Sequence, residues 1–236
     1  MENSSAFFWK NIFKLSDHLE QLERFLRTSN IMRLSNKAVS GDLVYFGGYS
    51  WIVLSVDEEE GKFLLLTRQL LAIMPMKYHG EKVDVTWENA DIRKYLRDVF
   101  YEKFSNEDRK IIQDTNVINS STPWFDTPGG NGTVDKFFLL SLDELVKYLG
   151  DSNQLAKKSW PYEGVKDFSK PCFVSDEYND LHKAINEHGE SFQYWLRSAG
   201  RDGTSAAFVR ADGTIDLAGE AVTAAAGVRP AVWVKL

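Results

Sequence analysis

Residues 193–234 read "QYWLRSAGRDGTSAAFVRADGTIDLAGEAVTAAAGVRPAVWV", and apolar and polar side chains alternate through much of this stretch. Such alternation is typical of half-buried β-strands. It predicts strands over residues 193–198, 206–219 and 227–234. Asp212-Gly213 lies between two alternating runs and predicts a two-residue hairpin turn. The end of the chain is therefore expected to form a β-sheet.

Working outward, residues 41–71 contain three further strand-like runs that are separated by glycine-containing turns. The middle of the chain has helical periodicity instead. Residues 86–104 predict a helix with a buried stripe of four apolar side chains, which are Ile92, Leu96, Val99 and Phe100. A short helix is expected from residue 105, and another over 176–189. Ser141 and Glu144 have the spacing of a capping box, which predicts the start of a helix at this point. Gly150 is placed to end that helix. Strands, then helices, then strands predict an α+β fold.

The first 36 residues form a separate unit in this interpretation, followed by one domain over 37–236. Apolar residues recur at threes and fours across residues 5–29, which predicts an amphipathic helix. This helix could cover part of the core. Its surplus of aromatic residues also favours self-association into a homo-oligomer, and binding to a membrane surface is a third alternative.

The composition of the chain excludes several kinds of partner and site. The formal net charge is −6 and the basic residues are scattered, so a nucleic-acid partner is not expected. Cys172 is the single cysteine, which excludes an intramolecular disulfide and a zinc site with several cysteines. The N-terminal residues lack the pattern of a secretory signal, and no apolar run has the length of a transmembrane segment. The expected location is the cytoplasm.

Motifs for catalysis and cofactors do not emerge from the sequence. His182 and His188 are six residues apart, and no clustered set of metal ligands accompanies them, so each is expected to be hydrogen-bonded or solvent-facing. The glycine-rich run at 127–133 lacks the Lys-Ser/Thr of a phosphate-binding loop. Residues 210–220 lack the alternate Asp/Asn ligands of a calcium loop. We therefore expect a non-enzyme with no catalytic residues, no metal and no cofactor.

Several stretches in one order carry a resemblance to a known family. They are "GDLVYFGGYSWIVL" (41–54), "VTWENADIRKYLRDVF" (85–100), "TPGGNGTVDKFFLLSLDEL" (127–145), "YWLRSAG" (194–200) and "GVRPAVWV" (227–234). Together they resemble a bacterial and phage family of unknown function. Its members look like the formylglycine-generating-enzyme branch of the C-type lectin fold. The resemblance covers residues 37–236 and implies a C-type-lectin-like fold, with the N-terminal helix outside it.

The resemblance also implies a function. Oxidases of this branch use paired cysteines that bind copper, and this chain has only Cys172. The chain is more similar to the variable proteins of diversity-generating retroelements, which display a mutable ligand-binding surface near the C terminus and whose ligand is expected here to be a protein. The alternatives are a formylglycine-generating-type oxidase and a phage structural or receptor-binding subunit. The implied variable positions are Arg201, Gly203, Thr204, Ser205, Leu217, Ala218, Thr223, Ala224 and Ala225.

The alanine-rich run "AVTAAAG" (221–227) has two interpretations. Small side chains allow close packing of strands or a tight loop. Alternatively, the run is one sampled version of an exposed binding surface that happens to carry small residues. Around it, alternation places five side chains in the core, which are Trp195, Phe208, Val228, Val232 and Trp233. Arg197 and Arg229 are expected to be structural anchors for loop carbonyls or carboxylates.

Overall fold

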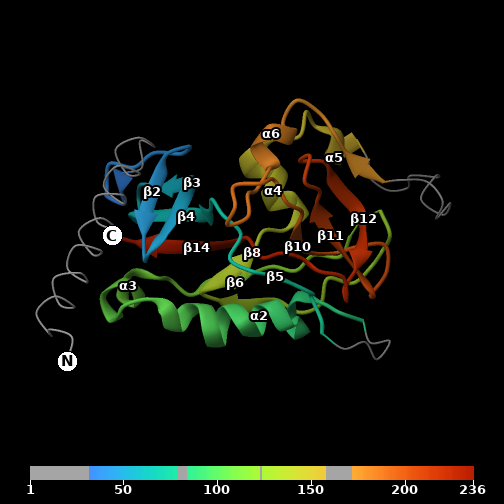
Figure 1. Cartoon of the computed structure of the whole chain (residues 1–236), viewed down its shortest axis with the longest axis horizontal. Helices are drawn as coiled ribbons and strands as arrows, with labels where there is room; N and C mark the ends of the chain where they lie inside the picture. Colours follow the sequence, from blue (N-terminus) through green and yellow to red (C-terminus); the bar gives the residue numbers. More distant parts are fainter. Residues whose placement is uncertain (1–31, 79–83, 123, 158–171) are drawn as a thin grey trace, which may run out of the picture.

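The computed structural model describes residues 32–78, 84–122, 124–157 and 172–236, and it shows an α+β fold. Two six-stranded sheets and one two-stranded sheet make up the β-structure of these residues. Figure 1 shows the sheets side by side, with a run of helical turns along one edge of the molecule. The helix expected over residues 5–29 lies outside the described residues.

The first sheet has the strand order β1-β2-β3-β4-β14-β8. Its strands are β1 (Met32–Arg33), β2 (Leu43–Phe46), β3 (Tyr49–Asp57), β4 (Lys62–Thr67), β14 (Pro230–Lys235) and β8 (Phe137–Leu139). The last strand, β14, lies inside this sheet and pairs Val232 with Leu65 of β4. On its other side β14 pairs with β8. The C-terminal residues are thus fixed between two segments that precede them by about a hundred residues or more.

The second sheet has the order β5-β13-β10-β11-β12-β9. Its strands are β5 (Ile73–Met74), β13 (Ala226–Gly227), β10 (Tyr194–Ala199), β11 (Ser205–Val209), β12 (Ile215–Ala221) and β9 (Phe173–Val174). The strands predicted over 193–198 and 206–219 are confirmed, the second as the β11–β12 pair. The strand predicted over 227–234 is divided between the sheets, because β13 belongs to the second and β14 to the first.

Helices cover the sheets at two places. They are α2 (Asp91–Tyr95), α3 (Asn106–Ile111), α4 (Leu142–Leu149), α5 (Gln154–Lys157) and α6 (Asn179–His182). A π-helical turn, Leu96–Phe100, continues α2. The small sheet pairs β6 (Thr115–Val117) with β7 (Thr133–Asp135). No helix among the described residues has the length and apolar character needed to cross a membrane.

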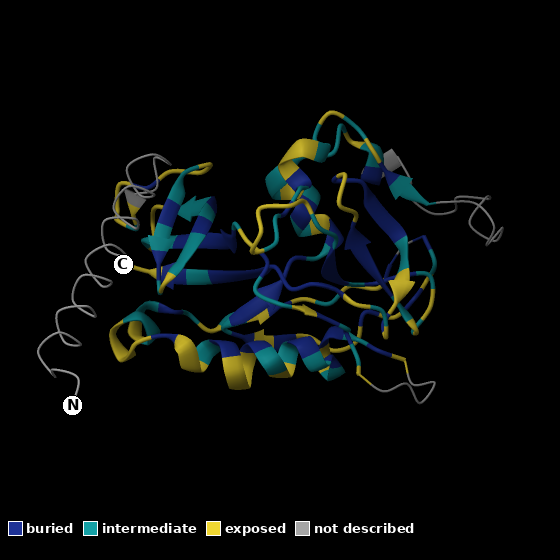
Figure 2. Ribbon diagram, in the orientation of Figure 1, coloured by how far each residue is buried: buried dark blue, intermediate teal, exposed yellow. Residues whose placement is uncertain are grey.

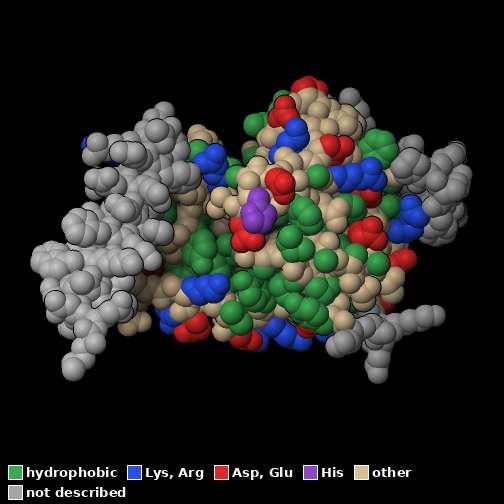
Figure 3. All heavy atoms as spheres, in the orientation of Figure 1, with side chains coloured by type: hydrophobic (Ala, Val, Ile, Leu, Met, Phe, Trp, Pro, Cys, Tyr) green, Lys and Arg blue, Asp and Glu red, His purple; other side chains and the backbone are tan. Residues whose placement is uncertain are grey.

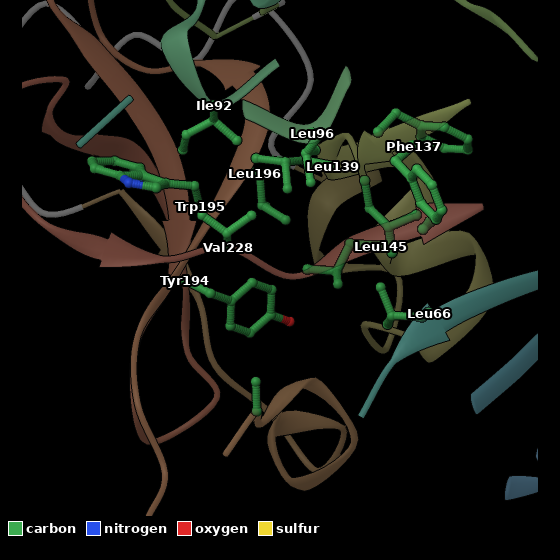
Figure 4. Packing of buried hydrophobic residues seen from close by; sticks show 14 of the residues in the cluster. Leu66, Ile92, Leu96, Phe137, Leu139, Leu145, Tyr194, Trp195, Leu196 and Val228 are labelled. Atoms are coloured by element: carbon green, nitrogen blue, oxygen red, sulfur yellow. The ribbon is translucent and has the colours of Figure 1, made fainter. Parts of the chain in front are cut away.

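The core lies between the sheets and the helices, as the buried residues of Figure 2 show. In Figure 4, Ile92 and Leu96 of the helical run face Leu196 and Trp195 of β10. Of the five predicted core residues, Trp195, Phe208, Val228 and Val232 are buried, and Trp233 is partly buried against the core. The burial of four of these residues is therefore confirmed, but β10, β11 and β14 are buried over consecutive residues rather than on one alternating face.

Both ends of α4 agree with the prediction from the sequence. The Ser141 side chain accepts from the Glu144 amide, and the Glu144 carboxylate accepts from the Ser141 amide, so the predicted capping box is confirmed. Gly150 ends the helix with a φ of 86°, a conformation that favours glycine.

Two local predictions are wrong, and a third is confirmed with a different loop length. Val99 was expected in the buried stripe of the 86–104 helix but is 49% exposed, because the π-helical turn changes the rotation of the helix at this point. The helix expected over 176–189 is limited to α6. The Asp212-Gly213 hairpin is confirmed, but its loop spans three residues, 211–213. The Arg210 amide donates to Thr214 O, and Gly213 has a φ of 88°.

Candidate ligand-binding surface

A self-contained turn joins β10 to β11 over residues 200–205. The Gly200 amide donates to Ser205 O at 2.8 Å and closes the turn. Inside it, the Asp202 carboxylate accepts from the Thr204 amide at 2.9 Å and from Thr204 Oγ1 at 2.8 Å. Ser205 Oγ also lies 3.2 Å from the same carboxylate oxygen. Asp202 therefore organises the turn from within.

The ionisation of Asp202 reflects these contacts. Partial burial acts to raise the pKa of its carboxyl, but hydrogen bonds from Thr204 and Ser205 and the charge of Arg201 outweigh it. The net effect holds the pKa of Asp202 below the ordinary value of 3.8. The turn is consequently built around an ionised carboxylate at neutral pH.

Backbone hydrogen bonds fix this turn to the later segments of the predicted surface. The Arg201 amide donates to Ala218 O of β12 at 2.8 Å. The Val222 amide donates to Thr204 O at 2.9 Å, one residue before Thr223 begins the predicted variable run. The structure thus brings the turn, Ala218 and the start of the 223–225 segment together at one end of the second sheet.

The predicted positions differ in exposure. Thr204, Thr223 and Ala225 are exposed, and five others are partly exposed, namely Arg201, Gly203, Ser205, Ala218 and Ala224. Leu217 was wrongly placed among the surface residues, because its side chain is completely buried. The amide of Leu217 donates to Cys172 O beside β9, and its side chain lies with Ile215 in the core. Gly203 is constrained as well, because a Cβ atom at this position would clash with the side chain of Asp84. Seven of the nine expected positions therefore remain candidates for a binding surface.

Each of the two interpretations of the alanine-rich run holds for a different part of it. Ala226 is 1% exposed and pairs with Met74 of β5, so a small residue is needed there. A Cβ atom on Gly227 would clash with the side chain of Leu70, so this position is closely packed too. Thr223 and Ala225 are exposed and have no such constraint. Close packing explains the end of the run, whereas its middle is open to larger side chains.

Sequence reasoning missed the neighbours that brace this surface. Thr127 Oγ1 donates to Arg201 O at 3.0 Å, and the Arg201 guanidinium carbon lies 5.8 Å from the centre of the Phe125 ring. The Val85 amide donates to Gly203 O at 2.7 Å. These contacts join segments about 70 residues apart or more, and nothing in the local pattern of the 119–131 loop indicates them.

A second neighbour, residues 72–78, runs antiparallel to 222–228. The Lys77 amide donates to Val222 O, and Val228 donates to Ala72 O. The first five residues of "AIMPMKY" (72–78) are all apolar, so the sequence does not indicate which side chains face the core. In the structure Met74 and Met76 are buried, whereas Ile73 and Tyr78 are exposed. Ile73 therefore adds an exposed apolar side chain next to the predicted surface.

The two arginines predicted to be structural are confirmed in that role. Arg197 donates to both carboxylate oxygens of Glu144, to Leu139 O and Ile118 O, and to the Asn119 side chain. It thereby ties the start of the 119–131 loop to α4. Arg229 donates to Thr67 O, His182 O and Tyr194 Oη, which joins the two sheets.

The two described histidines also match their expectation. His182 is buried, with Nδ1 at 3.1 Å from Gly213 O and Nε2 at 2.8 Å from Gly150 O. His188 is exposed. Within the described ranges, no three His, Cys, Asp or Glu side chains are grouped so that they could hold a metal ion.

Comparison with known proteins gives one match. The model of a family described as "Domain of unknown function (DUF6273)" matches residues 60–236, which is well over half of the chain. The matched range includes the 200–205 turn, the 223–225 segment, the whole second sheet, and strands β4, β8 and β14 of the first sheet. The chain matches none of the curated proteins and none of the solved structures with which it was compared.

Proposed function

The chain belongs to the DUF6273 family, whose function is unknown, and we propose that it is a non-catalytic protein that binds a protein ligand through a changeable surface. The surface consists of the exposed side chains of the 200–205 turn, Ala218 and the 223–225 segment. We further propose that the domain has a C-type-lectin-like fold of the formylglycine-generating-enzyme branch. In this proposal it is a variable protein of a diversity-generating retroelement.

One observation carries the proposal. The hydrogen bonds that hold the surface segments together, Arg201 N to Ala218 O and Val222 N to Thr204 O, are made by the backbone. The exposed side chains of Thr223 and Ala225 have no part in them. Substitutions at exposed positions of this kind usually change stability by only about 0.5 kcal/mol in either direction. Such a surface can change its chemistry while the scaffold stays folded.

The scaffold beneath the surface supports the same interpretation. Arg197 of "WLRS" and Arg229 of "GVRP" are buried, and the motifs that carry them flank the proposed variable stretch. Both arginines bind backbone carbonyls far away in the sequence. They fix the two ends of the stretch whatever residues lie between them.

An oxidase of the formylglycine-generating type is the alternative that the resemblance raises. That chemistry uses two cysteines, and the sequence supplies only Cys172. Cys172 lies beside β9, where its carbonyl accepts from the Leu217 amide, and it is half-buried. The alternative of a phage structural or receptor-binding subunit would use the same surface with a fixed sequence.

Sequencing of the gene and its surroundings in many isolates tests the proposal. We expect a reverse transcriptase gene beside a near-copy of the 3′ end of this gene. Substitutions should concentrate at template adenines, in the codons of Arg201, Thr204, Thr223 and Ala225. The codon of buried Leu217 should keep an apolar residue. Variation spread evenly over scaffold and surface codons would contradict a retroelement variable protein.

A further inference from the structure

We propose that a pocket beside the 223–225 segment takes a lysine or arginine side chain of the protein ligand. The inference rests on the proposed function, because it assigns a chemistry to part of the same binding surface. It concerns residues that lie outside the nine predicted variable positions.

The pocket has an apolar floor and a polar rim, with a volume of about 300 Å³. Four consecutive residues form the floor and three form the rim; they are Leu70, Leu71, Ala72 and Ile73, and Asn186, Glu187 and His188. The Leu70 amide donates to Ile185 O at 2.9 Å and joins floor to rim. Figure 3 shows hydrophobic side chains in a hollow beside a histidine and acidic side chains.

The rim is a preformed turn that leaves one carboxylate available. Asn186 Oδ1 accepts from the amides of His188 and Glu190, at 2.9 and 3.0 Å, and Asn186 Nδ2 donates to the Glu190 carboxylate. The Glu187 side chain takes no part in this turn and is 86% exposed. Its neighbour is His188 Nε2 at 3.6 Å. Among the described residues that line the pocket none is a lysine or arginine, and Glu187 supplies a carboxylate to the rim.

Continuity with the proposed surface comes from β5 and β13. Ile73, on the floor, pairs with Gly227, two residues after exposed Ala225. Gln193 Nε2 donates to Ala225 O at 3.3 Å, on the side of β13 opposite to β5. A ligand that contacts Thr223 and Ala225 therefore lies within reach of the pocket.

The chemistry of the pocket fits a long basic side chain. The methylene stem of lysine or arginine packs well on apolar surface while its charged end stays in water. Here Leu71 and Ile73 would contact the stem, and the cation would reach the Glu187 carboxylate. A net charge of −6 also favours the approach of a basic ligand. A carboxylate side chain would be repelled, and a neutral aliphatic one would lose the ion pair.

The test uses Nα-acetyl-lysine N-methylamide as the probe and NMR spectra of the full chain labelled with ¹⁵N. The norleucine analogue has an equally long stem without the charge. We expect saturable shifts at the amides of Ala72, Ile73 and His188 with the lysine probe, and weaker binding of the norleucine analogue. Glu187→Gln should weaken binding of the lysine probe about threefold, a change typical of an exposed ion pair. Glu58→Gln, on the distant β3–β4 turn, should leave it unchanged.

Equal affinity for both probes, or equal effects of Glu187→Gln and Glu58→Gln, would overturn the assignment. Its failure is distinguishable from failure of the proposed function. If variants randomised at the exposed positions fold and bind targets while the lysine probe does not bind, only the pocket assignment is wrong. If the probe binds but the randomised variants unfold, the pocket stands and the changeable surface does not.

Discussion

The backbone amide of Val222 donates a hydrogen bond to the carbonyl oxygen of Thr204 at 2.9 Å. This bond joins the 200–205 turn to the segment that leads into the last strands. Because it involves no side chain, the identity of Thr204 and of the residues after Val222 can change without breaking it. The connection between the two segments therefore does not depend on the side chains that face the solvent at Thr223 and Ala225.

The alanine-rich run gives the first prediction. Thr223→Tyr combined with Ala225→Asn should change the free energy of unfolding by about 0.5 kcal/mol or less, because both positions are exposed. Ala226→Asn, one position later, should cost about 1–3 kcal/mol through overpacking alone, since Ala226 is buried against β5. Urea denaturation of the variants measures both. Similar losses in the two would show that the whole run is packed.

Leu217 separates the structural account from the sequence-based surface. Leu217→Ala should destabilise the protein by about 2–5 kcal/mol, because it leaves a cavity in the core. Ala218→Ser, at the adjacent and partly exposed position, is the matched control and should have a small effect. Thermal unfolding of both variants decides the matter. A Leu217→Ala variant as stable as the parent would contradict the burial of Leu217 and would support its place on the surface.

The Arg197–Glu144 pair anchors the 119–131 loop to α4. Glu144→Ala should destabilise the protein by about 3 kcal/mol, because it leaves the buried guanidinium of Arg197 without its carboxylate. The double variant with Arg197→Met should recover part of this loss, since no unpaired charge then remains. Calorimetry of the two single variants and the double variant gives the coupling energy. Additive losses would argue against a buried charge pair.

Asp202 should give the turn a dependence on pH. Its folded-state pKa is lowered, so its contribution to stability is complete above the ordinary value of 3.8 and is lost as the pH falls through the lower folded-state value. ¹³C NMR of the Asp202 carboxyl should show a midpoint below 3.8. Asp202→Asn should remove that part of the acid sensitivity. A carboxyl that titrates at its ordinary value would mean that the turn does not favour the charged form.

Periodic and local signals identified most of the fold. The alternation around Trp195 and Val232 found the strands, and the spacing of Ser141 and Glu144 found the start of α4. The division of 227–234 between two sheets was not predictable, because it depends on pairing with β5 and β4, more than 150 residues earlier. Val99 was misplaced for a related reason, since a π-helical turn changes the helical period locally.

The sequence could indicate which segments form the candidate surface, but not which of their side chains are buried or which distant residues contact them. The resemblance implied that the 201–205 and 223–225 segments contribute to one surface, which requires them to lie close together. The backbone bonds between Thr204 and Val222 and between Arg201 and Ala218 connect these parts of the chain. Leu217 was misplaced because its side chain turns into the core beside β9. The bracing of Arg201 by Thr127 depends on tertiary contact alone, which periodicity does not reveal.

A display library tests the changeable binding surface most directly. Arg201, Thr204, Thr223 and Ala225 are randomised together in the full chain, and folded variants are counted by resistance to protease before selection on an arbitrary protein target. We predict that most variants stay folded and that selection yields binders that the parent chain lacks. A matched library at buried Leu217, Ala226, Val228 and Val232 should be mostly unfolded. If the two libraries lose folding equally, or if folded variants never yield binders, the proposed function is contradicted.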